Sequence, residues 1–277
     1  MLTVFLGLGS SLSYAISDML SQRASRAADV TRIVFWVLLV GVILVVPVAL
    51  IAHGLPHGDD QWHAAGLAAL AGVGYVGAYF SLLVGLRRGD LSLVAALSAT
   101  QGAFVALWAI LAGEQMTALV AAGLALAIVG GTLSAVEGRA KTTAGAGWAL
   151  LSAALFAVVV VLYDHAHALP SLSVAAVSRT TSFLAIVPVV LFAGGGVKVA
   201  RSLRLTVAEA GALEILGLVF VTASVAVGPL AIAGVMISQF ATFAVLLGMV
   251  FLRERPRPHQ LFGVACTIAA VSVLAAR

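Results

Sequence analysis

Long apolar runs fill most of the chain and are separated by short breaks that carry charged residues, glycine or proline. A helix needs about 20 residues to cross the ~30 Å hydrocarbon core of a bilayer. Backbone groups in lipid must bond within their own segment, so each run predicts a helix. The breaks predict ten membrane-spanning helices, at residues 2–22, 33–52, 63–86, 91–111, 115–136, 146–164, 172–193, 209–228, 231–252 and 259–276.

The composition agrees with an all-α, polytopic membrane protein. Hydrophobic residues make up 62% of the chain and charged residues 9%, with a mean hydropathy of +1.15. Soluble domains carry about 25% charged residues, so a water-facing surface cannot be built from this supply. No Lys or Arg precedes Arg23. A cleaved signal peptide begins with a basic region, so residues 2–22 are predicted to be a retained first span.

The basic residues are concentrated in the odd-numbered predicted loops. Thirteen of the 15 Lys and Arg residues lie there: Arg23, Arg26, Arg32, Arg87, Arg88, Arg139, Lys141, Lys198, Arg201, Arg204, Arg253, Arg255 and Arg257. Cytoplasmic loops carry an excess of Lys and Arg. The distribution therefore predicts a multi-pass protein of the cell (inner) membrane, with odd-numbered loops in the cytoplasm and both termini outside it.

Two stretches of the chain repeat one pattern at an offset of 140 residues. "AGEQMTALVAAGLALAIVGGTLS" (112–134) aligns with "LRERPRPHQLFGVACTIAAVSVL" (252–274), so that Glu114 falls on Glu254 and Gly123 on Gly263. Because each half holds five predicted spans, an odd number, the halves have opposite orientation. We therefore expect two inverted repeats, residues 1–138 and 145–277, that form one structural unit. Inverted repeats commonly build transporters around a site at the bilayer midplane.

The same pattern resembles a known family. Each half has "GE" or "RE" before its last helix and a glycine nine residues after the Glu, and an arginine opens its second span, Arg32 in "VTRIVFW" and Arg179 in "VSRTTSF". These features resemble the EamA type of the drug/metabolite transporter superfamily. The resemblance implies export of small metabolites, often amino acids, driven by ion or substrate gradients. It also implies alternating access at a cavity lined by spans one, three, four, six, eight and nine.

The chain departs from this family pattern in two ways. Family members often have cytoplasmic termini, whereas the charge distribution here predicts the reverse. A proline often lies midway along the fourth span of each half, where this chain has Gln101 and Ala241.

Polar and aromatic side chains inside the predicted spans are the candidates for substrate binding. Polar groups in lipid are costly and usually face the protein interior or a cavity. One helical face of the first span carries Ser10, Ser13, Tyr14, Ser17 and Ser21. Tight helix packing is the alternative for the serines, and structural hydrogen bonding is the alternative for Gln and Tyr. The candidates are Ser10, Tyr14, Tyr75, Tyr79, Ser98, Gln101, Trp108, Phe156, Ser238, Gln239 and Thr242.

Charged residues within or beside the spans suggest pairs. Asp18 and Arg32 lie across the first hairpin, and Asp164 and Arg179 lie across the hairpin of spans six and seven. Such pairs act as structural latches, or as coupling elements if a carboxylate exchanges its partner for a proton. Glu114 and Glu254 begin helices, where a carboxylate suits the positive end of the helix dipole. Glu214, early in the eighth span, receives no role.

The remaining chemistry is sparse. His53, His57 and His63 accompany Asp59 and Asp60, but their spacing matches no metal signature, so a solvated loop is the favoured interpretation. No catalytic constellation and no dinucleotide-binding context occurs. We therefore expect no enzyme activity, no cofactor, no metal and no nucleic-acid partner. The expected partners are a small-molecule substrate, the lipid bilayer and a coupling ion such as a proton, with monomer and homodimer both open.

The function that the sequence favours is secondary transport of small organic solutes, as an exporter of amino acids or related metabolites. Three alternatives stay open. A lipid or lipid-precursor flippase would have a cavity open sideways to the bilayer. An intramembrane enzyme would need acids or histidines clustered at one depth. A non-transporting membrane subunit would show no flux of any solute.

Overall fold

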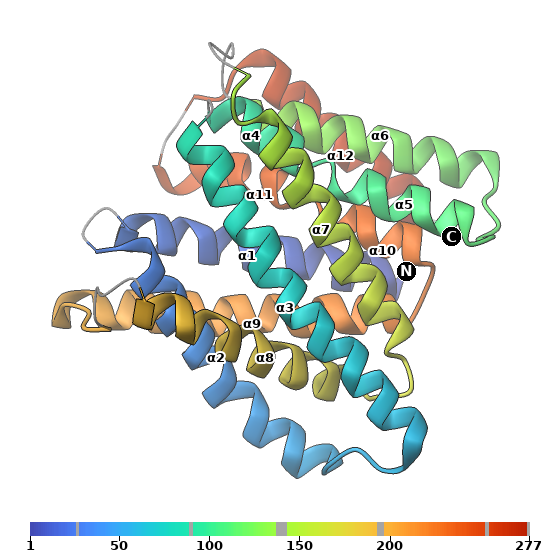
Figure 1. Cartoon of the computed structure of the whole chain (residues 1–277). Coiled ribbons are helices and arrows are strands. Elements are labelled where there is room, and N and C mark those ends of the chain that lie inside the picture. Colours follow the sequence, from blue (N-terminus) through green and yellow to red (C-terminus); the bar gives the residue numbers. More distant parts are fainter. Residues whose placement is uncertain (26–27, 89–90, 137–142, 193–196, 253–254, 276–277) are drawn as a thin grey trace.

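The computed structural model describes residues 1–25, 28–88, 91–136, 143–192, 197–252 and 255–275, and all regular structure within these ranges is helical (Figure 1). Eight of its segments are long and apolar enough to cross a membrane by length and composition, and Ala96–Leu111 is a shorter apolar helix. The chain is therefore an all-helical, polytopic membrane protein. The eight segments are Thr31–His53, Gly58–Leu82, Ala118–Ala135, Ala146–His165, Ser171–Phe192, Arg201–Ala226, Leu230–Phe251 and Pro258–Ala275.

Each apolar run of the sequence is helical in the structure. The helices of the first half are α1 (Leu2–Ser25), α2 (Val30–His53), α3 (Gly58–Arg88), α4 (Leu91–Ser98), α5 (Gln101–Leu111) and α6 (Ala118–Ala135). Those of the second half are α7 (Ala146–His165), α8 (Ser171–Phe192), a 3-10 turn η1 (Arg201–Leu203), α9 (Arg204–Ala226), α10 (Leu230–Ile237), α11 (Phe240–Leu247), a π-helical turn η2 (Gly248–Leu252) and α12 (Pro258–Ala275).

The predicted runs 91–111 and 231–252 are each interrupted near the middle. The first divides into α4 and α5, and the second into α10, α11 and η2. Beside each break, a hydroxyl donates to a carbonyl three residues earlier: Thr100 Oγ1 to Leu97 O at 2.6 Å, and Ser238 Oγ to Val235 O at 2.8 Å. Such local bonds compete with the regular helical ladder and bend helices. The breaks therefore occur without the proline that the family often uses.

Consecutive helices run back and forth between two sides of the molecule. In Figure 1, the connections from α2 to α3, from α7 to α8 and from α9 to α10 lie at the right. The start of α1 and the end of α12 lie on the same side. The end of α1 and the start of α9 lie at the left. This alternation is what a chain that crosses a bilayer repeatedly requires.

The two halves of the chain interleave. The most extensive helix contacts join α1 to α9, α3 to α7, and α6 to α12, so each joins a first-half helix to a second-half helix. Further contacts across the halves join α2 to α8 and α5 to α10. The halves therefore bury their surfaces against each other and form one packed body.

The helices α6 and α12 approach each other closely at a pair of glycines. A Cβ atom added at Gly130 would lie 2.7 Å from the carbonyl oxygen of Gly263, and one added at Gly263 would lie 2.7 Å from the carbonyl oxygen of Gly130. Both contacts are with backbone, which cannot rotate away. Small residues at such positions let membrane helices approach closely and gain van der Waals contact.

We predict that Gly263→Ala destabilises the protein, because the added methyl group forces α6 and α12 apart. Overpacking of this kind costs about 1–3 kcal/mol. The measurement is the thermal unfolding midpoint of the purified protein in detergent. Gly66→Ala is the matched control, because a Cβ at Gly66 in α3 meets no atom within 4 Å. Equal midpoints for the two variants would contradict this account of the α6–α12 contact.

Candidate functional site

A cavity of about 140 Å³ lies at the centre of the bundle. At about 10–15 Å³ per water, it has room for roughly ten water molecules, which is the size range of a small organic solute. Its walls come from α1, α3, α4, α5, α7, α9, α10 and α11, which correspond to the predicted spans one, three, four, six, eight and nine. The lining residues are Tyr14, Asp18, Tyr75, Tyr79, Leu82, Ser98, Gln101, Phe156, Val159, Val160, Tyr163, Glu214, Leu218, Val221, Ile237 and Phe240.

Aromatic rings dominate this cavity. The chain has four tyrosines, and all four line it, together with two phenylalanines. The rings of Tyr75 and Tyr79 are nearly parallel, with centroids 6.4 Å apart. Phe156 of α7 meets Tyr75 edge-on at 5.7 Å. Gly217 of α9 leaves room for the Tyr14 ring of α1, since a Cβ at Gly217 would lie 3.0 Å from Tyr14 Cε1.

Glu214 of the cavity wall belongs to a buried ion pair, whose arginine does not itself line the cavity. Arg179 Nη2 of α8 lies 2.6 Å from Glu214 Oε2 of α9, and the side chains are 1% and 7% exposed. Tyr75 of α3 donates its hydroxyl to Glu214 Oε1 at 2.8 Å, and the Arg179 guanidinium lies 5.4 Å from the Tyr75 ring centroid. Gly41 of α2 makes room for the arginine, since a Cβ there would lie 3.0 Å from Arg179 Cδ.

The second carboxylate at the cavity has no such partner. Asp18 of α1 is exposed, and it makes no hydrogen bond or ion pair with the residues that the structure describes. The lining residues include no Lys, Arg or His. With Glu214 neutralised by Arg179, the cavity carries the charge of Asp18 alone.

Several neutral polar groups also face this space without a partner. The buried Ser98 Oγ has no hydrogen bond. The side chains of Gln101, Tyr14 and Tyr79 make none with the described residues either. Buried polar groups are normally paired, so these groups are available to a solute or to water.

The comparison with protein families assigns the chain. A model of the EamA-like transporter family matches residues 1–136 and matches again at residues 143–276. The chain belongs to the EamA-like transporter family. It is therefore a membrane transporter of the drug/metabolite transporter type.

Other comparisons add the fold. A solved structure described as "Crystal structure of protein" is similar to this chain over 99% of its length and 96% of the other chain, with a TM-score of 0.79 and 18% identity. At this identity the likeness concerns the fold alone. Among curated proteins, none matches this chain.

Six of the eleven predicted binding residues of this EamA-like transporter meet at the cavity: Tyr14, Tyr75, Tyr79, Ser98, Gln101 and Phe156. Three others lie elsewhere. Ser10 is buried and donates to Gly7 O within α1, as in the packing alternative. Ser238 lies against Gly102 of α5 and donates to Val235 O. Trp108 is 47% exposed and does not line the cavity.

The last two, Gln239 and Thr242, belong to a separate buried network between α11, α6 and α12. Gln239 Nε2 donates to Ala127 O at 3.2 Å and to Val235 O at 3.0 Å. Its Oε1 accepts from Thr267 Oγ1 at 3.1 Å and from Thr242 Oγ1 at 3.4 Å. Because the amide is fully paired within the protein, its geometry matches structural hydrogen bonding.

The predicted charge pairs do not form. Arg179 pairs with Glu214 rather than with Asp164, whose Oδ2 lies 4.0 Å from Nδ1 of the exposed His165. Asp18 and Arg32 form no ion pair in the described part of the chain, and Asp18 faces the cavity instead. Glu214 was not among the residues predicted to form a charge pair or a site. The available signal was that Arg179 is the one charged residue of the predicted span 172–193, and that Glu214 lies within the next span, 209–228, which also holds Glu209.

Glu114 meets a helix start, but on the other half of the molecule. Its Oε2 accepts from the backbone N–H of Ala231 at 3.3 Å, in the first turn of α10. The helix that follows it in sequence, α6, is capped by Thr117, whose hydroxyl accepts from the N–H of Val120. Glu254 lies outside the described residues.

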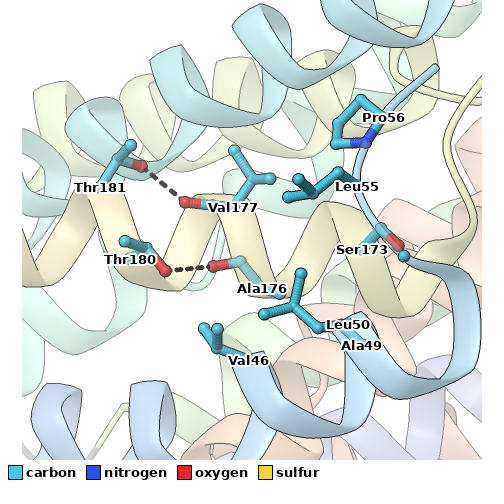
Figure 2. A pocket seen from close by; sticks show the side chains of 11 residues that line it. Val46, Ala49, Leu50, Leu55, Pro56, Ser173, Ala176, Val177, Thr180 and Thr181 are labelled. Atoms are coloured by element: carbon cyan, nitrogen blue, oxygen red, sulfur yellow. Dashed lines mark hydrogen bonds between the residues drawn. The ribbon is translucent and has the colours of Figure 1, made fainter.

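A second pocket, of about 210 Å³, lies between α2, α8 and the connection from α2 to α3 (Figure 2). Its walls are mostly apolar. Thr180 and Thr181 donate their hydroxyls to carbonyls of their own helix, at Ala176 and Val177. Of the polar side chains on its walls, Ser173 alone makes no hydrogen bond with the described residues. Within the described ranges, no group of three or more His, Cys, Asp or Glu side chains could hold a metal ion.

We predict that Glu214→Gln strongly destabilises the protein, because it leaves the Arg179 guanidinium buried without a counter-charge. Breaking a buried ion pair costs about 3–5 kcal/mol. The unfolding midpoint in detergent is the measurement, and Glu209→Gln, at an exposed position on the same helix, is the control. The double variant Arg179→Leu/Glu214→Leu should recover part of the loss. If Glu214→Gln unfolds at the same temperature as Glu209→Gln, the pair does not stabilise the fold.

Proposed function

We propose that this chain is a secondary transporter that exports small organic solutes, amino acids or related metabolites, by alternating access through the central cavity. The observation that carries the proposal is the cavity itself. Its walls come from both segments that match the family, and polar groups that have no partner among the described residues face it. An ion or substrate gradient would drive transport, and a proton is one such coupling ion.

We further propose that ten spans form two inverted repeats, residues 1–138 and 145–277. The double match of the family model supports this arrangement. The packing supports it too, because α1 contacts α9 and its repeat counterpart α7 contacts α3, the counterpart of α9. The helix breaks after Ser98 and Ile237 fall at nearly equivalent places in the two halves. Discontinuous helices of this kind often form transporter sites near the midplane.

Alternating access would then consist of one half rocking against the other around the cavity. The hydrogen bond from Tyr75 to Glu214 joins α3 of the first half to α9 of the second. Such a bond between the halves can be made in one state and broken in the other. The ion pair of Arg179 and Glu214 lies within the second half and would move as a unit.

We propose that the termini lie outside the cytoplasm and that the protein resides in the cell (inner) membrane. Arg23 at the end of α1, Arg88 at the end of α3 and Arg201 in η1 support this orientation under the positive-inside rule. An alkaline phosphatase fused after Arg277 should be active, and a green fluorescent protein fused there should be dark. The reverse pair of signals would invert the proposed orientation.

The test of transport is uptake by proteoliposomes of labelled amino acids and organic cations, with and without imposed proton or substrate gradients. We predict that Ser98→Leu lowers flux at least ~10-fold, because its side chain fills part of a cavity that offers only about 140 Å³. Ser272→Leu, at an exposed position on α12, is the matched control and should transport normally.

The outcomes separate the alternatives. Flux that depends on an open cavity supports the proposal. Absence of flux for every solute, in vesicles that hold folded protein, would contradict transport. Normal flux in Ser98→Leu would show that the solute passes elsewhere.

A further inference from the structure

We propose that the central cavity selects organic cations, with primary aromatic amines as the fitting class, ahead of the corresponding amino acids. The inference rests on the proposed function in taking this cavity as the solute site. It narrows the solute to one charge type, which the family match does not provide.

Aromatic rings and phenol groups are concentrated in the central cavity. Six aromatic side chains line a cavity of about 140 Å³, including every tyrosine in the chain. The ring quadrupole attracts a cation placed over its face within about 6 Å. The structure shows one such contact at a lining residue, where the guanidinium of Arg179, which does not line the cavity, lies 5.4 Å from the Tyr75 ring centroid. An aromatic solute would in addition stack against Tyr79 and Phe156.

The cavity wall carries a net negative charge. Arg179 neutralises Glu214 at 2.6 Å, so Asp18 provides the net charge of the wall. The lining residues offer no Lys, Arg or His to a solute carboxylate. An ammonium group would gain a charged acceptor at Asp18. The carboxylate of an amino acid would lose its water and find no cation, which is costly in a place of low dielectric.

Neutral hydrogen-bond acceptors also face the central cavity. Ser98 Oγ is buried without a hydrogen bond, and within the described part of the chain the amide of Gln101 and the phenol of Tyr14 have no hydrogen-bond partner. An ammonium has three donors, and Asp18 can accept only some of them. The hydroxyl and amide oxygens can accept hydrogen bonds from the remaining ammonium N–H groups. A carboxylate would gain less from these neutral groups, because they bind it more weakly than a guanidinium does.

The test measures binding of three related compounds to the purified full chain by isothermal titration calorimetry in detergent. Phenethylamine is a cation, 2-phenylethanol is its neutral counterpart, and phenylalanine is the amine with a carboxylate added. We expect phenethylamine to bind at least ~10-fold more tightly than either of the others, the effect of a charge-assisted hydrogen bond. Failure of phenethylamine to bind, or tighter binding of phenylalanine, would overturn the inference.

Variants identify the residues responsible. Asp18→Asn should lower the affinity for phenethylamine at least ~10-fold and leave the affinity for 2-phenylethanol unchanged. Asp18→Glu keeps the carboxylate and should retain most of the preference for phenethylamine over 2-phenylethanol. Asp59→Asn, an exposed acid at the start of α3, is the matched control and should bind as the parent protein does. An unchanged phenethylamine affinity in Asp18→Asn would overturn the role of this carboxylate.

A second position keeps the test decisive if Asp18→Asn does not fold. Tyr79→Leu should lower the affinity for phenethylamine more than the affinity for 2-phenylethanol. Tyr79→Phe keeps the ring and should keep the preference for phenethylamine. Equal losses of both compounds in Tyr79→Leu would contradict recognition of the cation by the ring.

Binding and flux together distinguish the two proposals. If phenethylamine binds with the stated dependence on Asp18 but no solute crosses the membrane, transport fails and cation selection stands. If amino acids cross as readily as amines, and Asp18→Asn does not change this ratio, cation selection fails and transport stands.

Discussion

The ion pair of Arg179 and Glu214 is the constraint around which the centre of this molecule is arranged. An uncompensated charge costs several kcal/mol in a medium of low dielectric, and these side chains are almost fully buried. Each therefore needs the other within contact distance. This fixes α8 against α9, and the hydrogen bond from Tyr75 ties α3 to the same point. Gly41 on α2 completes the arrangement by leaving space for the arginine.

The cavity follows from this arrangement and from the broken helices. The ends of α4 and α10 come at the breaks, and Ser98, Gln101, Ile237 and Phe240 beside these breaks line the cavity. The rest of the interior is filled closely, as the contact between Gly130 and Gly263 illustrates. A packed body that holds a polar, aromatic space between two segments matched by the same family model has the architecture that a carrier requires.

The sequence predicted the helices because an apolar run of about 20 residues can satisfy its backbone hydrogen bonds within lipid only as a helix. It also predicted Tyr14, Tyr75, Tyr79 and Gln101 at the cavity, because polar groups amid apolar runs need an interior position. It failed with Trp108, which shares a helical face with Gln101 but lies two turns, about 10 Å, farther along the axis. Periodicity specifies the face and not the depth.

The pairing of charges failed for a related reason. The sequence paired Arg179 with Asp164, its neighbour across a short hairpin, but the structure pairs it with Glu214 on the next helix. Contacts between helices depend on packing angles and depth, which hydrophobic periodicity does not contain. The same holds for Gln239, whose amide is paired by α6 and α12 rather than directed at the cavity.

The central claim is that a solute occupies the space between the two halves. An experimental structure of the full chain with a bound small aromatic amine tests it most directly. The account predicts density for the amine among Tyr14, Tyr75, Tyr79 and Phe156, with its nitrogen toward Asp18. Density found only in the apolar pocket between α2 and α8, with the central cavity unchanged, would contradict it.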